Sequence, residues 1–128
     1  MKSEKRNYDD IKLEFDEALR LRDAGRMAEA EAILCRLARQ RPDVAAIYGV
    51  LGDVQEEQGK MPEAAASYRR ATELSPASEL ASISLFHALR SLGDLDGALD
   101  EMRRFRIRRP SPEYDRLIRE LQLDLPDR

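Results

Sequence analysis

The chain has 128 residues, which is enough for one domain with a continuous core, and its formal net charge is −3. That charge argues against a general nucleic-acid-binding protein, because such proteins are usually basic. No apolar run approaches the length that spans a membrane, and the single cysteine, Cys35, cannot form a disulfide within the chain. The N-terminal segment lacks the apolar stretch of a secretory signal. We therefore expect a cytoplasmic protein that binds neither membrane nor nucleic acid.

Helical spacing of apolar residues runs through most of the chain and predicts seven helices and no strand. Residues 1–7 are polar and charged, and we expect them to be disordered. The expected helices are residues 8–23, 27–39, 44–58, 61–74, 79–91, 95–108 and 112–123, followed by a frayed tail at 124–128. Short turns at Gly25, Gly59 and Gly93 make each pair of neighbouring helices an antiparallel hairpin.

The first helix has an unusual apolar face. This face consists of Tyr8, Ile11, Phe15, Ala18 and Leu19, with Leu13 and Leu21 to its sides. Two interpretations remain open for it. In the first, the helix tilts and buries this face against the second helix. In the second, part of the face stays open for a partner or for a second copy of the chain.

The fifth and seventh helices have contrasting patterns. The fifth, residues 79–91, has apolar residues on more than one face, so it is either deeply buried or exposes apolar groups. The seventh has one apolar stripe, as expected of a helix that covers the end of a stack: Tyr114, Leu117, Ile118 and Leu121. Asp43, Ser78 and Ser111 are the expected N-caps of the third, fifth and seventh helices.

A repeat of 34 residues relates three parts of the chain. Turn, core and helix-ending positions all recur in phase. The matching sets are Gly25, Gly59 and Gly93; Ala30, Ala64 and Ala98; Pro42, Pro76 and Pro110; Met27, Met61 and Leu95; Leu34, Tyr68 and Met102; Leu21, Gln55 and Leu89; and Ala18, Gly52 and Phe86.

The middle copy resembles the tetratricopeptide repeat (TPR). The residues that carry the resemblance are Tyr48, Leu51, Gly52, Gly59, Ala64, Tyr68, Ala71 and Pro76. The resemblance implies an all-α TPR superhelix in a single domain of residues 8–123, with repeats at 11–44, 45–78 and 79–112 and a capping helix at 112–123. In the first helix, Glu14 and Glu17 occupy positions where the family has bulky apolar residues.

In TPR proteins the first helices of successive repeats line a concave groove that holds a partner peptide or helix. Carried over to this sequence, the groove positions are Lys12, Phe15, Leu19, Arg22, Gly49, Asp53, Glu56, Leu80, Ile83, His87 and Arg90. They predict an acidic centre between apolar patches. Gly49 either lets a ligand approach closely or relieves crowding in its helix. The resemblance therefore implies a protein–protein interaction scaffold.

The same positions exclude one TPR subclass. Co-chaperones that grip acidic chaperone tails need basic and amide side chains where this chain has Phe15, Leu19, Val50, Leu80 and Ser84. Asp53 and Glu56 would also repel an acidic tail. An apolar or basic partner segment is the more compatible ligand.

No residue pattern indicates catalysis, a metal site or a cofactor. One histidine, His87, cannot form a histidine cluster, and nothing places it beside Cys35 as an activating base. We expect a neutral structural thiol at Cys35 and no enzyme activity. The arginine-rich run at residues 103–109 is expected to be a solvated outer face, with an anionic partner as the alternative.

Three alternatives to a peptide-binding scaffold stay open. The chain could be a small chaperone or immunity-type inhibitor that sequesters one partner protein. It could be a structural module that self-assembles weakly through its N-terminal helix. An enzymatic function would require a metal or cofactor beside His87.

Overall fold

The computed structural model describes residues 8–123, and in this range the chain is all-α. Its helices are α1 (Tyr8–Asp23), α2 (Met27–Gln40), α3 (Ala45–Glu57), α4 (Met61–Leu74), α5 (Glu79–Ser91), α6 (Leu95–Arg108) and α7 (Pro112–Leu121). These bounds confirm the predicted helices to within two residues. The predicted disordered segment 1–7 and frayed tail 124–128 lie outside the described residues.

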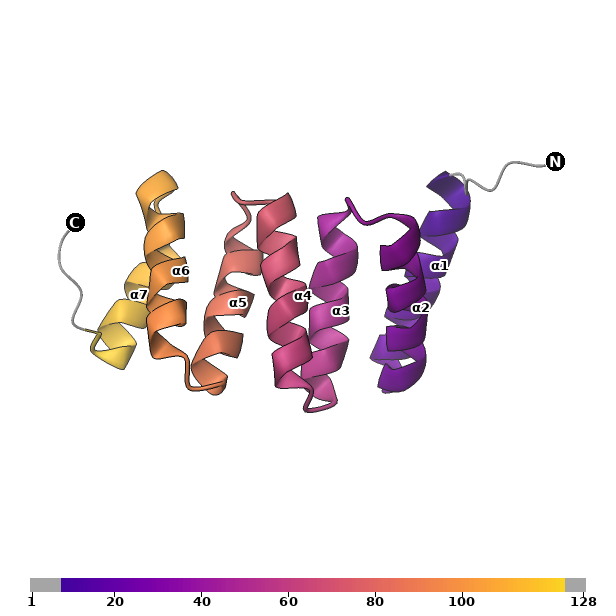
Figure 1. Cartoon of the computed structure of the whole chain (residues 1–128), viewed down its shortest axis with the longest axis horizontal. Helices are drawn as coiled ribbons and strands as arrows, with labels where there is room; N and C mark the ends of the chain where they lie inside the picture. The colour runs from indigo at the N-terminus through magenta and orange to yellow at the C-terminus, as the bar shows by residue number, and fades with distance from the viewer. Residues whose placement is uncertain (1–7, 124–128) are drawn as a thin grey trace.

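The hairpins stand side by side in the order of the chain, with their helices in two layers (Figure 1). Neighbouring helices pair as the hairpins α1–α2, α3–α4 and α5–α6, and α7 lies against the last hairpin at the end of the row. In Figure 1, α2, α4 and α6 are nearest the viewer, while α1, α3 and α5 form the far face. None of the helices within residues 8–123 is long and apolar enough to cross a membrane.

Each hairpin turn uses a glycine with a positive φ angle, as predicted. Gly25, Gly59 and Gly93 have φ of +80°, +79° and +83°, a left-handed conformation that costs other residues steric energy. The turn hydrogen bonds repeat as well. The backbone N–H groups of Arg26, Lys60 and Asp94 donate to the carbonyls of Leu21, Gln55 and Leu89. Three identical turns therefore set three equivalent hairpins.

The helix caps are partly as predicted. Ser78 and Ser111 accept hydrogen bonds from the backbone N–H groups of Ala81 and Tyr114, which confirms both as N-caps. The prediction for Asp43 was wrong. The N-cap of α3 is Val44, which has no side-chain cap, and the Asp43 carboxylate instead accepts from the Arg41 guanidinium at 3.3 Å.

The end of α7 also differs from its predicted position. The helix stops at Leu121 because Gln122 adopts a left-handed conformation with φ of 55°. The N–H of Leu123 then donates to the carbonyl of Ile118, and the Leu123 side chain packs against the core. This arrangement is the Schellman type of helix end, completed by an apolar contact.

The buried apolar side chains form two clusters. One lies among α1, α2 and α3, and the other among α4, α5, α6 and α7. Between them, the packing of α3 on α4 depends on small and polar groups. Gly52 lies under the ring of Tyr68, and the buried Ser67 hydroxyl donates to the side chain of Gln55 at 2.6 Å.

The apolar face of the first helix is partly buried and partly open. Ile11 and Ala18 lie in the core, whereas Tyr8 is 71% exposed and Leu13 is 65% exposed. Phe15 is half-buried and packs against the first cluster. Each of the two interpretations therefore holds for part of this face.

The fifth helix is likewise partly buried and partly exposed, so each of the two alternatives from its sequence holds for some of its apolar residues. Leu85, Phe86 and Leu89 are buried, whereas Leu80 is 78% exposed and Leu92 is 44% exposed.

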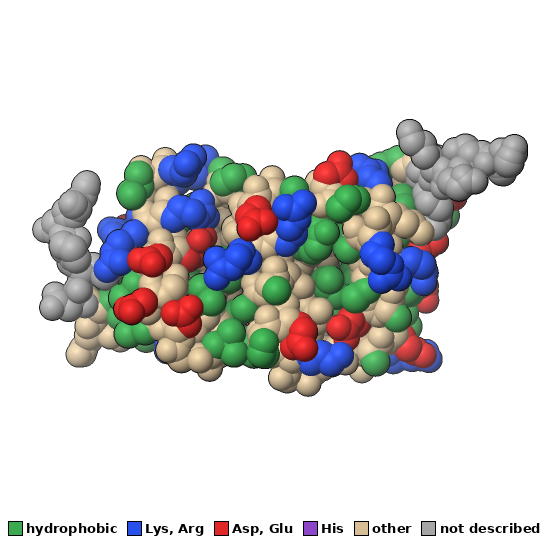
Figure 2. All heavy atoms as spheres, viewed as in Figure 1, with side chains coloured by type: hydrophobic (Ala, Val, Ile, Leu, Met, Phe, Trp, Pro, Cys, Tyr) green, Lys and Arg blue, Asp and Glu red, His purple; other side chains and the backbone are tan. Residues whose placement is uncertain are grey.

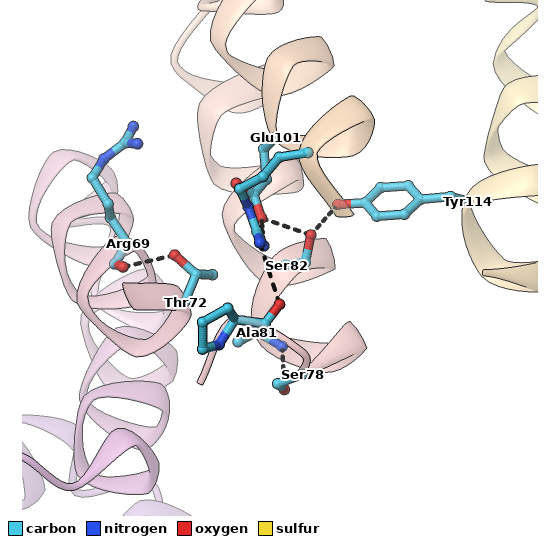
Figure 3. Close-up of polar contacts among 9 residues, drawn as sticks. Arg69, Thr72, Ser78, Ala81, Ser82, Glu101 and Tyr114 are labelled. Carbon is cyan, nitrogen blue, oxygen red and sulfur yellow. Dashed lines mark hydrogen bonds and ion pairs between the residues drawn. The ribbon is translucent and has the colours of Figure 1, made fainter. Parts of the chain in front are cut away.

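A buried polar network joins α7 to the last hairpin (Figure 3). The Ser82 hydroxyl bonds to the Glu101 carboxylate and to the Tyr114 hydroxyl, both at 2.7 Å. The Arg104 guanidinium forms a two-pronged ion pair with Glu101, at 2.9 and 2.6 Å, and also donates to the carbonyl of Pro76. Within residues 8–123, no buried side-chain nitrogen or oxygen lacks a hydrogen-bond partner. The network therefore fixes α7 without leaving a polar group unsatisfied.

Candidate functional site

The predicted groove residues occupy equivalent positions on α1, α3 and α5. The 34-residue repeat places them in rows across the three helices, and we call the surface they form the first-helix face. Its rows are Lys12 and Leu80; Phe15, Gly49 and Ile83; Leu19, Asp53 and His87; and Arg22, Glu56 and Arg90.

None of these residues is fully buried. Lys12, Asp53, Glu56, Leu80 and Arg90 are exposed, and the other six are half-buried. Half-buried apolar groups beside exposed charges suit a binding surface. A partner can cover the apolar area that is still exposed to water, while the charges orient it.

An open pocket of about 490 Å³ lies between the C-terminal ends of α1 and α3. Its lining brings together three predicted groove residues, Arg22, Asp53 and Glu56. Asp23, Met27 and Glu57 complete it. Asp23 and Met27 flank the first turn and were not among the predicted site residues. With four carboxylates and one guanidinium, the pocket is acidic.

Two of these carboxylates share one hydroxyl donor. The Tyr68 hydroxyl, which reaches across from α4, lies 2.7 Å from Asp53 Oδ1 and 2.8 Å from Glu56 Oε1. A phenol has a single proton, so it can fully satisfy only one carboxylate at a time. Burial, followed by these two hydrogen bonds, raises the pKa of Tyr68 well above its ordinary value. The carboxylates therefore keep acceptor capacity for a cationic partner.

Tyr68 was predicted as a core residue and not as a site residue. Its ring is indeed buried, at 2% exposure. Only the hydroxyl tip reaches the first-helix face, and the repeat spacing gives no signal for that reach.

Gly49 lies in the middle of α3 with open space around it. A methyl group added there would meet no atom within 4 Å outside its own helix. Crowding by a neighbouring helix therefore does not require a glycine at this position. The bare backbone leaves a gap in the row between Phe15 and Ile83.

His87 and Cys35 have no catalytic arrangement around them. Burial, followed by the neighbouring Arg90 charge, lowers the pKa of His87, so the imidazole is neutral at physiological pH. Burial raises the pKa of the Cys35 thiol. Among residues 8–123, no group of three or more histidine, cysteine, aspartate or glutamate side chains is placed to hold a metal ion.

Comparison with known proteins identifies the class of protein that this repeated hairpin defines. The chain is a tetratricopeptide-repeat protein. Residues 15–79, just over half of the chain, match the family described as tetratricopeptide repeat. No curated protein matches the chain.

Several solved structures share the fold. The Yersinia enterocolitica type III secretion chaperone SycD, in complex with a peptide of the translocator YopD, has 15% identity and a TM-score of 0.76, over 91% of this chain and 89% of that chain. The second TPR of Spaghetti, bound to an HSP90 peptide, has 18% identity and a TM-score of 0.69, over 76% and 90%. A mutant of MamA has 18% identity and a TM-score of 0.70, over 80% and 75%. At these identities the likeness shows the fold alone.

Proposed function

We propose that this protein is a non-catalytic interaction scaffold whose first-helix face binds a partner segment that combines apolar and basic side chains. The observation that carries the proposal is the acidic pocket formed by Arg22, Asp23, Asp53, Glu56 and Glu57 beside half-buried apolar residues. A lysine or arginine side chain would enter the pocket and pair with carboxylates that share the single Tyr68 donor.

Apolar contacts would supply the remaining affinity. Phe15 and Ile83 are half-buried on either side of Gly49, and Leu80 is 78% exposed at the edge of the same face. Burying such side chains against a partner is favourable in proportion to the apolar area removed from water. An acidic tail of the kind that co-chaperones bind is disfavoured, because Asp53 and Glu56 would repel it.

A chaperone-like role for one partner protein is the second candidate. The exposed Leu80 favours it, as does the fold shared with SycD, which was solved with a translocator peptide. The two roles use the same face. They differ in whether the partner needs this protein in order to remain soluble.

Self-assembly through the N-terminal helix fits the structure less well. Leu51 and Val54 are buried in α3. The equivalent positions of α1, one repeat earlier, are Glu17 and Arg20. These two charges form an exposed ion pair at 2.6 Å. Charge at positions where inner repeats bury apolar groups is expected of a terminal helix.

The experiment is affinity capture from the native cytoplasm, where we expect the protein to act, with purified wild-type protein as bait. Asp53→Arg should lose the captured protein, because it replaces one of the four pocket carboxylates with a cation that repels a basic side chain. Leu80→Asp should lose it as well and is a safer choice than Phe15→Asp, since Phe15 packs against the core. Asp96→Arg, the same charge reversal at an exposed position of α6 and outside this face, is the matched control. Capture that survives both Asp53→Arg and Leu80→Asp would exclude the first-helix face.

A further inference from the structure

Arginine side chains are concentrated over the C-terminal halves of α2, α4 and α6. Residues 36–41, 69–74 and 103–109 contain ten arginines and a single carboxylate, Glu73. We call these ten residues the arginine band: Arg36, Arg39, Arg41, Arg69, Arg70, Arg103, Arg104, Arg106, Arg108 and Arg109. Figure 2 looks onto this side of the molecule and shows basic side chains (blue) spread over all three helices. The concentration runs against the net charge of −3 of the whole chain.

Six of the ten guanidinium groups already have partners within the chain. They pair with carboxylates as Arg36–Glu14, Arg41–Asp43, Arg70–Glu73, Arg103–Asp100, Arg104–Glu101 and Arg106–Asp115. These pairs support the packing of the hairpins and leave limited capacity for another ligand.

The other four band arginines are exposed and have no side-chain partner within residues 8–123: Arg39, Arg69, Arg108 and Arg109. A cation in the last turn of a helix complements the helix dipole, which accounts for Arg39 and Arg108. It does not account for Arg69, which lies before the last turn of α4. The band therefore has more positive charge than the fold uses.

An exposed isoleucine lies within the band. Ile107 is 83% exposed, the most exposed large hydrophobic side chain of residues 8–123. It follows Arg103 by four residues on α6, so the two side chains lie on the same side of the helix. A single exposed apolar side chain is common on protein surfaces, and what distinguishes Ile107 is that it lies among arginines, some of which have no side-chain partner within residues 8–123. It is well suited to a contact that combines charge with apolar burial.

We propose that the arginine band binds an acidic segment of a partner protein, with Ile107 as its apolar anchor. The binding surface is separate from the first-helix face. Guanidinium groups pair with carboxylates through two parallel hydrogen bonds, which gives such a contact orientation as well as attraction. A segment with glutamate or aspartate along one side and an apolar residue at the level of Ile107 complements this surface.

The same observations disfavour two other anionic occupants. A nucleic acid and an anionic membrane are extended polyanions, so the negative charge of the whole chain opposes them more strongly than it opposes a short acidic segment. Contacts to the phosphates of a nucleic acid also make no use of Ile107. The contact with an acidic protein segment uses both the free guanidinium groups and the isoleucine.

The test is titration of the whole protein with a labelled synthetic peptide that has glutamates along one side of a helix and a leucine among them on that same side. Wild-type protein should bind this peptide more tightly than a glutamate-only peptide of the same charge. Arg108→Glu/Arg109→Glu and Ile107→Glu should each weaken binding about tenfold or more. Arg20→Glu/Arg26→Glu, an equal charge change at exposed positions outside the band, should leave binding unchanged, as should Asp53→Arg in the first-helix face.

Three outcomes would overturn the proposal. Binding that is insensitive to the Arg108, Arg109 and Ile107 variants would place the peptide elsewhere. Tighter binding of single-stranded oligothymidylate, or of vesicles with phosphatidylserine, lost in the same variants, would assign the band to another class of ligand. Self-association of the wild-type protein that the same variants abolish would make a second copy the occupant. Circular dichroism of each variant checks the fold, because a glutamate at position 108 opposes the dipole of α6 although Arg108 and Arg109 form no side-chain pair within residues 8–123.

Discussion

The ring of Tyr68 on α4 lies directly over Gly52 on α3. A methyl group at Gly52 would be 2.5 Å from Cε1 of Tyr68, far inside van der Waals contact. The positions equivalent to Gly52 and Tyr68 hold Ala18 and Leu34 in the first hairpin. In the third hairpin they hold Phe86 and Met102. The three hairpins therefore keep one backbone arrangement with three combinations of side-chain size.

This relationship predicts that Gly52→Ala destabilises the protein. The extra methyl group must displace a buried aromatic ring, and overpacking of this kind costs about 1–3 kcal/mol, partly offset by the better helix propensity of alanine. Urea unfolding followed by circular dichroism measures the change in the free energy of unfolding.

Gly49→Ala is the matched control, in the same helix and three residues away. Its methyl group would meet no atom within 4 Å outside its own helix, so only the helix propensity changes. The variant should be more stable by about 0.5–1 kcal/mol. Equal effects of the two alanines would mean that Tyr68 can move aside at no cost.

Two neighbouring arginines on α6 predict very different losses of stability. Arg104 pairs with Glu101, which is only 7% exposed and lies in the network of Ser82 and Tyr114. Arg103 pairs with Asp100, which is 77% exposed. Removing the partner of a buried charge leaves that charge uncompensated, whereas an exposed pair contributes little.

Arg104→Ala should therefore lower the free energy of unfolding by about 1–3 kcal/mol, allowing for the partial exposure of this guanidinium. Arg103→Ala should lower it by less than about 0.5 kcal/mol. Thermal unfolding of the two variants at the same pH gives the comparison. Similar melting temperatures would show that Glu101 finds water or another donor when Arg104 is absent.

The repeat spacing was sufficient to predict the helices, because each period places a turn glycine, small core residues and a helix-ending proline in phase. Gly25, Gly59 and Gly93 all have the positive φ that this reasoning requires. Asp43 was the misassigned cap, since residue type alone cannot show that Arg41 competes for the same carboxylate.

The seventh helix shows a further limit of the period. Its inward residues Tyr114 and Leu117 correspond in burial to Ser82 and Leu85 of α5, 32 residues earlier and not 34. The connection before α7 is shorter than the connection before α5, and the helix is rotated accordingly. Contacts set by this shift, such as Ser82 with Tyr114, could not be read from the repeat.

The candidate site was predictable only in part, for the same reason. Periodicity indicates which positions of α1, α3 and α5 share a face, and it places Arg22, Asp53 and Glu56 together as the structure does. It does not indicate how far a side chain from another helix reaches. The Tyr68 hydroxyl on Asp53 and Glu56 is such a long-range contact.

The two buried tyrosines predict a loss of stability in alkali. Burial is the main cause that raises the pKa of Tyr68 and of Tyr114 above the ordinary value of 10.0. At high pH the unfolded chain loses these protons before the folded chain does, so stability is complete below pH 10 and falls as the pH rises further. Each tyrosine should lower the free energy of unfolding by about 1.4 kcal/mol for each pH unit above its unfolded pKa, until the pH reaches its folded pKa.

Tyr68→Phe and Tyr114→Phe separate this effect from other alkaline titrations. Hydrogen bonds to carboxylates also raise the pKa of Lys12 and Lys60, and their deprotonation acts in the same direction. Each phenylalanine variant should therefore be less stable than wild type at neutral pH but should lose less stability between pH 9 and about 11. Urea midpoints across that range provide the measurement, and slopes equal to the wild-type slope would contradict the assignment.

Ser111 holds the start of α7 through two opposite roles of one hydroxyl. Its oxygen accepts the backbone N–H of Tyr114 at 3.0 Å, and its proton goes to the Glu79 carboxylate at 2.5 Å. Ser111→Ala loses both bonds and should cost about 1–2 kcal/mol. Ser111→Asp should be no more stable than Ser111→Ala, because it places a second carboxylate beside Glu79. This holds although aspartate is as good an N-cap as serine.

The combination of Ser111→Asp with Glu79→Gln decides between the two roles. A glutamine at position 79 can donate to the new aspartate, so the double variant should regain most of the stability that Ser111→Asp loses. Ser78→Asp, at the equivalent cap of α5, should be nearly neutral, since among residues 8–123 the Ser78 side chain bonds to the N–H of Ala81 alone. Urea unfolding of wild type, Ser111→Asp, Glu79→Gln and the double variant completes the cycle, with Ser78→Asp measured beside them. If Ser111→Asp alone matched wild type, the cap would be the whole role of Ser111, and the bond to Glu79 would contribute nothing to holding α7 on the last hairpin.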